Sequence, residues 1–104
     1  MTDKLEGDAR ARALAGLKGW REVEGRDAIA RSFAFADFMT AFAFMGKVAV
    51  YADVVDHHPE WSNVYNKVAV TLTSHDVDGI SPRDIAMARF MDKAAAGLQK
   101  APAA

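Results

Sequence analysis

Cysteine is absent from this sequence of 104 residues. Its absence excludes disulfide frameworks, thiolate zinc sites, iron–sulfur clusters and cysteine nucleophiles, and it fits a reducing compartment. An excess of one charge is also lacking, because 13 basic and 14 acidic residues leave a net charge of −1. Proteins that grip nucleic-acid backbones usually carry a basic excess, so we expect no nucleic-acid partner.

Long uncharged hydrophobic runs are lacking as well. The most apolar stretch, Phe33 to Val55, is interrupted by Asp37, Lys47 and Asp53. A membrane span needs about 20 nearly uncharged residues. The N-terminal residues also lack the run of ~7–15 apolar residues that a signal peptide needs. We therefore expect a soluble, cytoplasmic protein with no membrane partner.

The sequence does contain enough apolar material for one core. Hydrophobic residues are 51% and charged residues 26% of the chain, which is ordinary for a globular protein. At roughly 100–150 residues per domain, the length allows a single domain. We expect this domain to span residues 1–104, with its core at about 8–98 and loose ends.

The N-terminal third predicts a short helix followed by a hairpin. Asp8 to Leu17 has apolar positions at helical spacing, with glycines at its end. Two runs of alternating polarity, 20–24 and 29–35, flank the turn sequence Gly25-Arg26-Asp27. Such runs around a glycine-containing turn are typical of a β-hairpin.

A long helix is predicted from Asp37 to about Val55, capped by Asp37 and stopped before Pro59. It carries two apolar stripes. The first consists of Phe38, Phe42, Met45, Ala49 and Ala52, and the second of Phe44, Val48, Tyr51 and Val55. Because a helix that is apolar on two sides cannot bury both against one sheet, we expect the second stripe to contact another subunit.

Alternation with period two returns between Asn63 and Ser74, which predicts one strand or two short strands folded at residues 65–67. The expected buried face of this region consists of Val64, Val68, Val70 and Leu72. After a turn at Asp78-Gly79, Ser81 and Pro82 begin a helix that runs to about Leu98. The order of elements predicts an α+β sandwich with helices packed on one face of an antiparallel sheet.

We expect the active site at the three histidines of the chain. His57 and His58 follow the long helix and His75 ends the next strand region, so the turn between them can bring helix end and strand end together. The neighbouring carboxylates are Asp53, Asp56 and Asp76. Imidazole has an unperturbed pKa of about 6.5, so such a cluster suits proton transfer.

Three other interpretations of the histidines compete with this one. They could be capping or surface residues, because a histidine near a helix C-terminus complements the helix dipole. A histidine zinc site with a carboxylate is another, although adjacent histidines point in different directions and suit one metal poorly. A hydrolase triad would need a positioned hydroxyl; Ser62 and Ser74 are near, but no nucleophile elbow is present.

The residues around the histidines resemble the signature of the pterin-4a-carbinolamine dehydratases. The run Asp56-His57-His58-Pro59-Glu60-Trp61-Ser62-Asn63-Val64-Tyr65 is followed by Val70-Thr71-Leu72-Thr73-Ser74-His75-Asp76, and then by Gly79-Ile80-Ser81 and Asp84. Upstream, Gly25-Arg26-Asp27-Ala28-Ile29 and Phe42-Ala43-Phe44-Met45 match too. The likeness extends without a gap from about Leu14 to Met91.

This resemblance implies a four-stranded antiparallel sheet with three helices, and a homodimer or homotetramer joined through the long helix and the sheet edges. It implies loss of water from 4a-hydroxytetrahydropterin to give quinonoid dihydropterin, in pterin cofactor recycling, with no metal or organic cofactor. Some animal members of the family bind a transcription factor and stabilise its dimer. The alternative function is therefore that of a non-enzymatic interaction protein.

By position, the resemblance gives His57, His58 and His75 as the catalytic histidines. His57 and His75 are the expected general acid–base pair, while His58 mainly binds and orients the pterin. The expected substrate-binding residues are Asp56, His57, His58, Thr73, Ser74, His75 and Asp76. The expected supporting residues are Asp53, Pro59 and Trp61, and Asp53 stands where several members carry glutamate. Tyr65 and Phe38 are assigned to the core.

Overall fold

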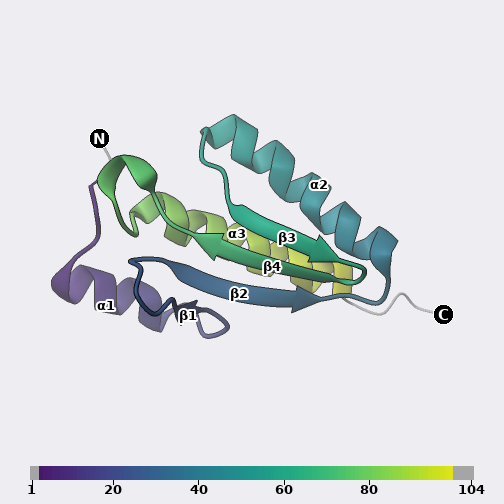
Figure 1. Cartoon of the computed structure of the whole chain (residues 1–104), viewed down its shortest axis with the longest axis horizontal. Coiled ribbons are helices and arrows are strands. Elements are labelled where there is room, and N and C mark those ends of the chain that lie inside the picture. Colours follow the sequence, from purple (N-terminus) through teal and green to yellow (C-terminus); the bar gives the residue numbers. More distant parts are fainter. Residues whose placement is uncertain (1–2, 100–104) are drawn as a thin grey trace.

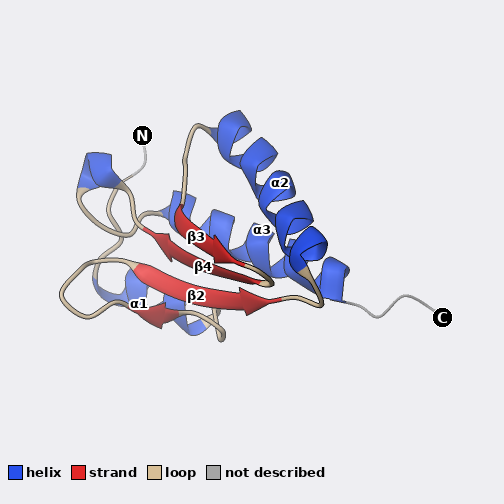
Figure 2. Cartoon of the chain, turned by 45° about the vertical axis from the view of Figure 1, so that its right-hand side comes forward, coloured by secondary structure: helices blue, strands red, loops and turns tan. Residues whose placement is uncertain are grey.

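The computed structural model describes residues 3–99 of the chain. Its elements, in chain order, are α1 (Gly7–Ala15), β1 (Arg21–Glu22), β2 (Ile29–Ala34), α2 (Phe38–Val55), β3 (Glu60–Val64), β4 (Lys67–Leu72), the 3₁₀ helix η1 (His75–Val77) and α3 (Pro82–Gln99). Three helices and a four-stranded antiparallel sheet confirm the predicted α+β fold, whose two layers are visible in Figures 1 and 2. The expectation of loose ends at residues 1–2 and 100–104 lies outside the described residues.

The sheet has the strand order β1-β2-β4-β3. Val64 ends β3 and lies opposite Lys67 of β4 across a two-residue turn. Both side chains therefore point to the same face, and Val64 is 73% exposed. The prediction that Val64 shares the buried face with Val68 is wrong, because the turn reverses the alternation between the two strands.

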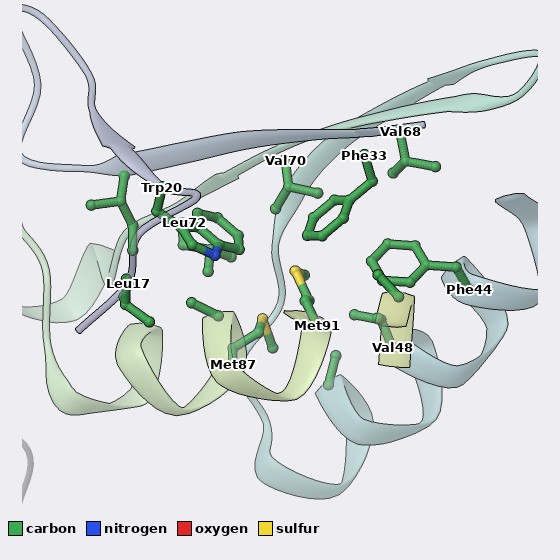
Figure 3. Packing of buried hydrophobic residues seen from close by; sticks show 14 of the residues in the cluster. Leu17, Trp20, Phe33, Phe44, Val48, Val68, Val70, Leu72, Met87 and Met91 are labelled. Carbon is green, nitrogen blue, oxygen red and sulfur yellow. The ribbon is translucent and has the colours of Figure 1, made fainter. Parts of the chain in front are cut away.

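One face of the sheet packs against α2 and α3 and forms the core (Figure 3). Phe44 and Val48 of α2 are fully buried there, and the Phe44 ring centroid lies 4.8 Å from that of Phe33 in β2. Tyr51, one turn further along α2, stacks on Phe90 of α3 at 4.3 Å. The expectation that this second stripe contacts another subunit is wrong for Phe44, Val48 and Tyr51, because these side chains pack into the core of their own chain. Val55, the last residue of the stripe and of α2, is 41% exposed.

The opposite side of α2 is left uncovered within the described chain. The large exposed side chains on that side, which we call the exposed face of α2, are Phe38, Met39, Phe42, Val50 and Val54. Phe38 and Tyr65, both expected in the core, are 45% and 62% exposed. By length and composition α2 could also cross a membrane, with a mean hydropathy of 1.5, but the core helix of a soluble protein meets the same criteria.

Polar contacts attach the remaining segments to this core. The Trp20 indole and the Arg31 guanidinium both donate to Asp92 of α3, at 2.9 and 2.7 Å. Leu5, in a segment expected to be loose, donates its amide to the Ile80 carbonyl at 2.7 Å. The N-terminal segment therefore lies against the loop between η1 and α3, beside the residues that follow β4.

Candidate active site

His57 is placed by the way α2 ends. Asp56 takes the left-handed conformation, with φ of 54°, and its amide donates to the Ala52 carbonyl, which closes the last turn. The chain then reverses, and the His57 side chain enters the protein, where the residue is only 7% exposed. Its Nε2 lies 2.6 Å from the Asp84 Oδ1 of α3.

Asp84 is fully buried and lies in the first turn of α3. Its Oδ2 accepts a hydrogen bond from the Ser81 amide at 2.9 Å and one from the Ser74 hydroxyl at 2.7 Å. The Ser74 and Ser81 hydroxyls are themselves 2.6 Å apart. A carboxylate is favourable at a helix N-terminus, where the unpaired amides and the helix dipole stabilise negative charge. His57, Ser74, Ser81 and Asp84 together form what we call the His57–Asp84 network.

The network determines what the His57 ring can do. An ionised carboxylate only accepts hydrogen bonds, so the bond to Asp84 places a proton on Nε2 of His57. Nδ1 is then the nitrogen that exchanges protons: it can take one as the neutral ring, and it can give one as the imidazolium beside Asp84. Since Ser74 lies two residues after the end of β4 and directly precedes His75, the network also joins the end of α2 to the segment that follows β4. An imidazole that is buried, oriented and charge-stabilised is suited to general acid–base chemistry.

His75 occupies a very different environment. It begins η1, its side chain is 77% exposed, and its Nε2 lies 3.3 Å from Oε2 of Glu60. Glu60 begins β3 and also binds the Arg26 guanidinium through two contacts of 2.9 Å. Hydrogen bonding to Arg26 holds the pKa of the Glu60 carboxyl below its ordinary value. A cavity of about 370 Å³ lies beside this group and is lined by Lys4, Gly25, Arg26, Asp27, Thr73, His75 and Asp78.

His58 lies on the surface although it is adjacent to buried His57. Its side chain is 57% exposed, and its Nε2 lies 2.9 Å from the Asp53 carboxylate one turn back on α2. Asp76 is also exposed and accepts from the Arg83 guanidinium at 2.6 Å. That hydrogen bond lowers the pKa of Asp76.

The remaining predicted site residues have mixed positions. Asp56 is exposed, whereas Pro59 and Trp61 are half-buried, and Trp61 packs against the core. Thr73 donates its hydroxyl to the Asp27 carbonyl at 2.9 Å and borders the cavity. Among residues 3–99, no group of three or more histidine, cysteine, aspartate or glutamate side chains is arranged to hold a metal ion.

The sequence offered no reason to assign a site role to four residues that lie beside the predicted catalytic histidines. Asp84 contacts His57 and Glu60 contacts His75. Ser81 and Arg26 bind these two carboxylates. Ser81 and Asp84 have the spacing of a helix cap, so their local signal was already explained without a site. Ser74 was expected to bind substrate. It is 1% exposed, and its hydroxyl donates to Asp84.

A family model, curated relatives and a solved structure all relate this chain to the same protein family. Residues 3–94 match the family described as “Pterin 4 alpha carbinolamine dehydratase”. A protein of Rhodopseudomonas palustris is 56% identical over 92 residues, covering 88% of this chain and 91% of its own, and one of Burkholderia cenocepacia is 54% identical over 99 residues, covering 95% and 97%. Both are named “Putative pterin-4-alpha-carbinolamine dehydratase”. The crystal structure of a “transcriptional coactivator/pterin dehydratase” from Brucella melitensis has a TM-score of 0.86 and 50% identity, covering 89% of this chain and 99% of its own.

Proposed function

Because the chain belongs to the pterin-4a-carbinolamine dehydratase family, we propose that it dehydrates 4a-hydroxytetrahydropterin to quinonoid dihydropterin and water. The observation that carries this proposal is the His57–Asp84 network, in which a buried carboxylate orients an imidazole at 2.6 Å. The setting is pterin cofactor recycling in the cytoplasm.

The reaction needs two proton transfers. The bond between C4a and the hydroxyl oxygen breaks, and the oxygen leaves with the electron pair and takes a proton to become water. N5 loses its proton, and the electrons of that N–H bond form the new C4a–N5 double bond. Hydroxide is a poor leaving group near neutral pH, so a positioned acid and base accelerate the step by about 10²–10⁴-fold.

We assign delivery of the proton to the leaving oxygen to the His57 imidazolium, and removal of the N5 proton to His75. The geometry of His57 supports a proton-transfer role, since Asp84 orients its ring and leaves one nitrogen to exchange a proton. The exposure of His75 beside a cavity supports its access to a small molecule. His58 would bind and orient the pterin, together with Asp56, Thr73 and Asp76. Ser74 would act through Asp84, and Asp53 would orient His58.

The test is to add purified protein to freshly prepared 4a-hydroxytetrahydropterin and follow the absorbance of the dihydropterin. His57→Ala and His75→Ala should each lower kcat by about 10- to 10³-fold in folded protein, whereas His58→Ala should mainly raise KM. A folded double variant with unchanged turnover would refute the assignment. Because proton transfer by imidazoles requires no Lewis acid, a chelator should leave the turnover intact.

Self-association belongs to this proposal as well. The exposed face of α2 is a contiguous apolar helix surface of the kind that marks interaction sites. The strands β1 and β3 lie at the edges of the sheet and offer backbone groups for pairing. We propose a homodimer or homotetramer formed through α2 and these edges.

The second candidate function is that of an interaction protein that stabilises the dimer of a transcription factor. It is favoured by the exposed face of α2 and by the coactivator name of the Brucella melitensis protein. The two candidates predict different effects of one substitution. His57→Ala should lower the rate of dehydration, but it should leave binding of an apolar partner helix to α2 unchanged.

A further inference from the structure

Arg26 and Glu60 form an ion pair that the proposed reaction does not yet use. Arg26 lies in the loop between β1 and β2, and Glu60 is the first residue of β3, 34 positions away in the sequence. Two guanidinium nitrogens each donate to a different Glu60 oxygen at 2.9 Å. This bidentate arrangement restricts the orientation of the carboxylate more strongly than a single contact would.

The oriented carboxylate faces His75. Its Oε2 lies 3.3 Å from Nε2 of the imidazole. Within the described chain, Glu60 is the one acidic side chain in ion-pair distance of His75, because the adjacent Asp76 is turned to Arg83. The other charged groups around the same cavity are Lys4, Arg26, Asp27 and Asp78. Hydrogen bonding to Arg26 lowers the pKa of Glu60, which favours the ionised carboxylate.

We propose that Glu60, held by Arg26, is a positioning residue for His75. The inference rests on the proposed function, in which His75 exchanges a proton with the pterin. Glu60 accepts from Nε2, which leaves Nδ1 toward the substrate, and its negative charge stabilises the imidazolium after His75 has taken a proton. The proton then leaves to solvent from the exposed ring, and Glu60 itself takes none. In catalytic sites without substrate, such contacts are often longer than in the reacting complex.

The experiment compares Glu60→Ala and Glu60→Gln with a matched control, Glu22→Gln. Glu22 is also exposed and lies 2.9 Å from Arg10, so the control removes a similar ion pair that does not contact a histidine. Glu60→Ala should lower kcat by about 3- to 30-fold with little change in KM. The acid limb of the kcat/KM profile against pH should move to lower pH in both Glu60 variants, because the protonated ring loses its nearby negative charge.

Two further measurements separate positioning from general damage. Adding Glu60→Ala to His75→Ala should cause no additional loss of turnover, because the carboxylate then has no imidazole to orient. The ring ¹⁵N resonances of His75 should shift in Glu60→Gln and stay unchanged in Glu22→Gln. Circular dichroism checks that every variant is folded.

The remaining outcomes distinguish failure of the inference about Glu60 from failure of the proposed function. Folded Glu60→Ala with unchanged kcat and pH profile overturns the inference while the proposed function stands. An equal loss in the His75→Ala background also overturns it, because Glu60 would then act elsewhere. If the wild-type protein is inactive on the pterin, the proposed function fails first, and unchanged His75 resonances would separately show that Glu60 does not orient the ring.

Discussion

Replacing Asp84 by asparagine changes one buried oxygen to an amide and leaves the side-chain volume nearly the same. The Asp84 carboxylate lies at hydrogen-bonding distance from three groups, His57 Nε2 at 2.6 Å, the Ser74 hydroxyl at 2.7 Å and the Ser81 amide at 2.9 Å. An asparagine oxygen can keep the two bonds on the serine side. Its NH₂ group must then face Nε2 of His57, where two donors would meet unless the ring changes tautomer.

The expected cost in stability is one hydrogen bond to a charged group, about 1.5–3 kcal/mol of unfolding free energy. The expected loss of kcat is severe, about 10²- to 10³-fold. The proton of His57 moves to Nδ1, and the ring loses the negative charge of the Asp84 carboxylate, which stabilises the imidazolium. Asp84→Ala should cost more stability, about 3–5 kcal/mol, because it leaves buried donors without acceptors.

Urea unfolding followed by circular dichroism gives the stability of both variants, and the dihydropterin assay gives kcat. The reasoning predicts that Asp84→Asn separates the two quantities, with a modest loss of stability and a severe loss of turnover. Folded Asp84→Asn with turnover within about two-fold of wild type would refute the role of the His57–Asp84 network in proton transfer.

Three further predictions concern the core, the exposed face of α2 and the acid response. Phe44→Ala should lower the free energy of unfolding by about 3–5 kcal/mol in urea titrations, because Phe44 is fully buried. Val54→Glu, at a residue that is 79% exposed, should leave the fold intact and weaken self-association in light scattering; Val48→Glu cannot serve as this test, because Val48 is in the core. The pKa of Glu60 is lowered from 4.5 by Arg26, so the pair stabilises the folded state above that pH and loses its effect as pH falls through the lower folded pKa. Arg26→Met should therefore flatten the dependence of unfolding free energy on pH below about 4.5, measured by urea titrations at several pH values.

The elements of the fold could be predicted because their signals are local. Asp37 caps α2 through the Thr40 amide at 2.8 Å, as its sequence position indicates. The faces of these elements were less predictable. Both stripes of α2 are apolar, and the choice between them depends on where β2 and α3 lie, which periodicity does not contain. Val64 was misplaced because the alternation alone left open whether the chain turned at Tyr65.

The candidate site was predictable only where the residue type is rare. Three histidines in a short chain draw attention by themselves, and the turn between them allowed their segments to meet. Asp84 is one of many acidic residues, and a position in the first turn of a helix explains it without any function. Its inward orientation follows from the packing of α3 against the end of α2, which is a tertiary contact.

The His57–Asp84 network also fixes when, during synthesis, the site can first exist. His57 leaves the ribosome before Ser74, Ser81 and Asp84, and 27 positions separate it from the carboxylate that orients it. A nascent chain that ends before α3 therefore holds the imidazole without its acceptor. The candidate site is completed only when the last helix docks, so the orientation of His57 depends on the docking of α3.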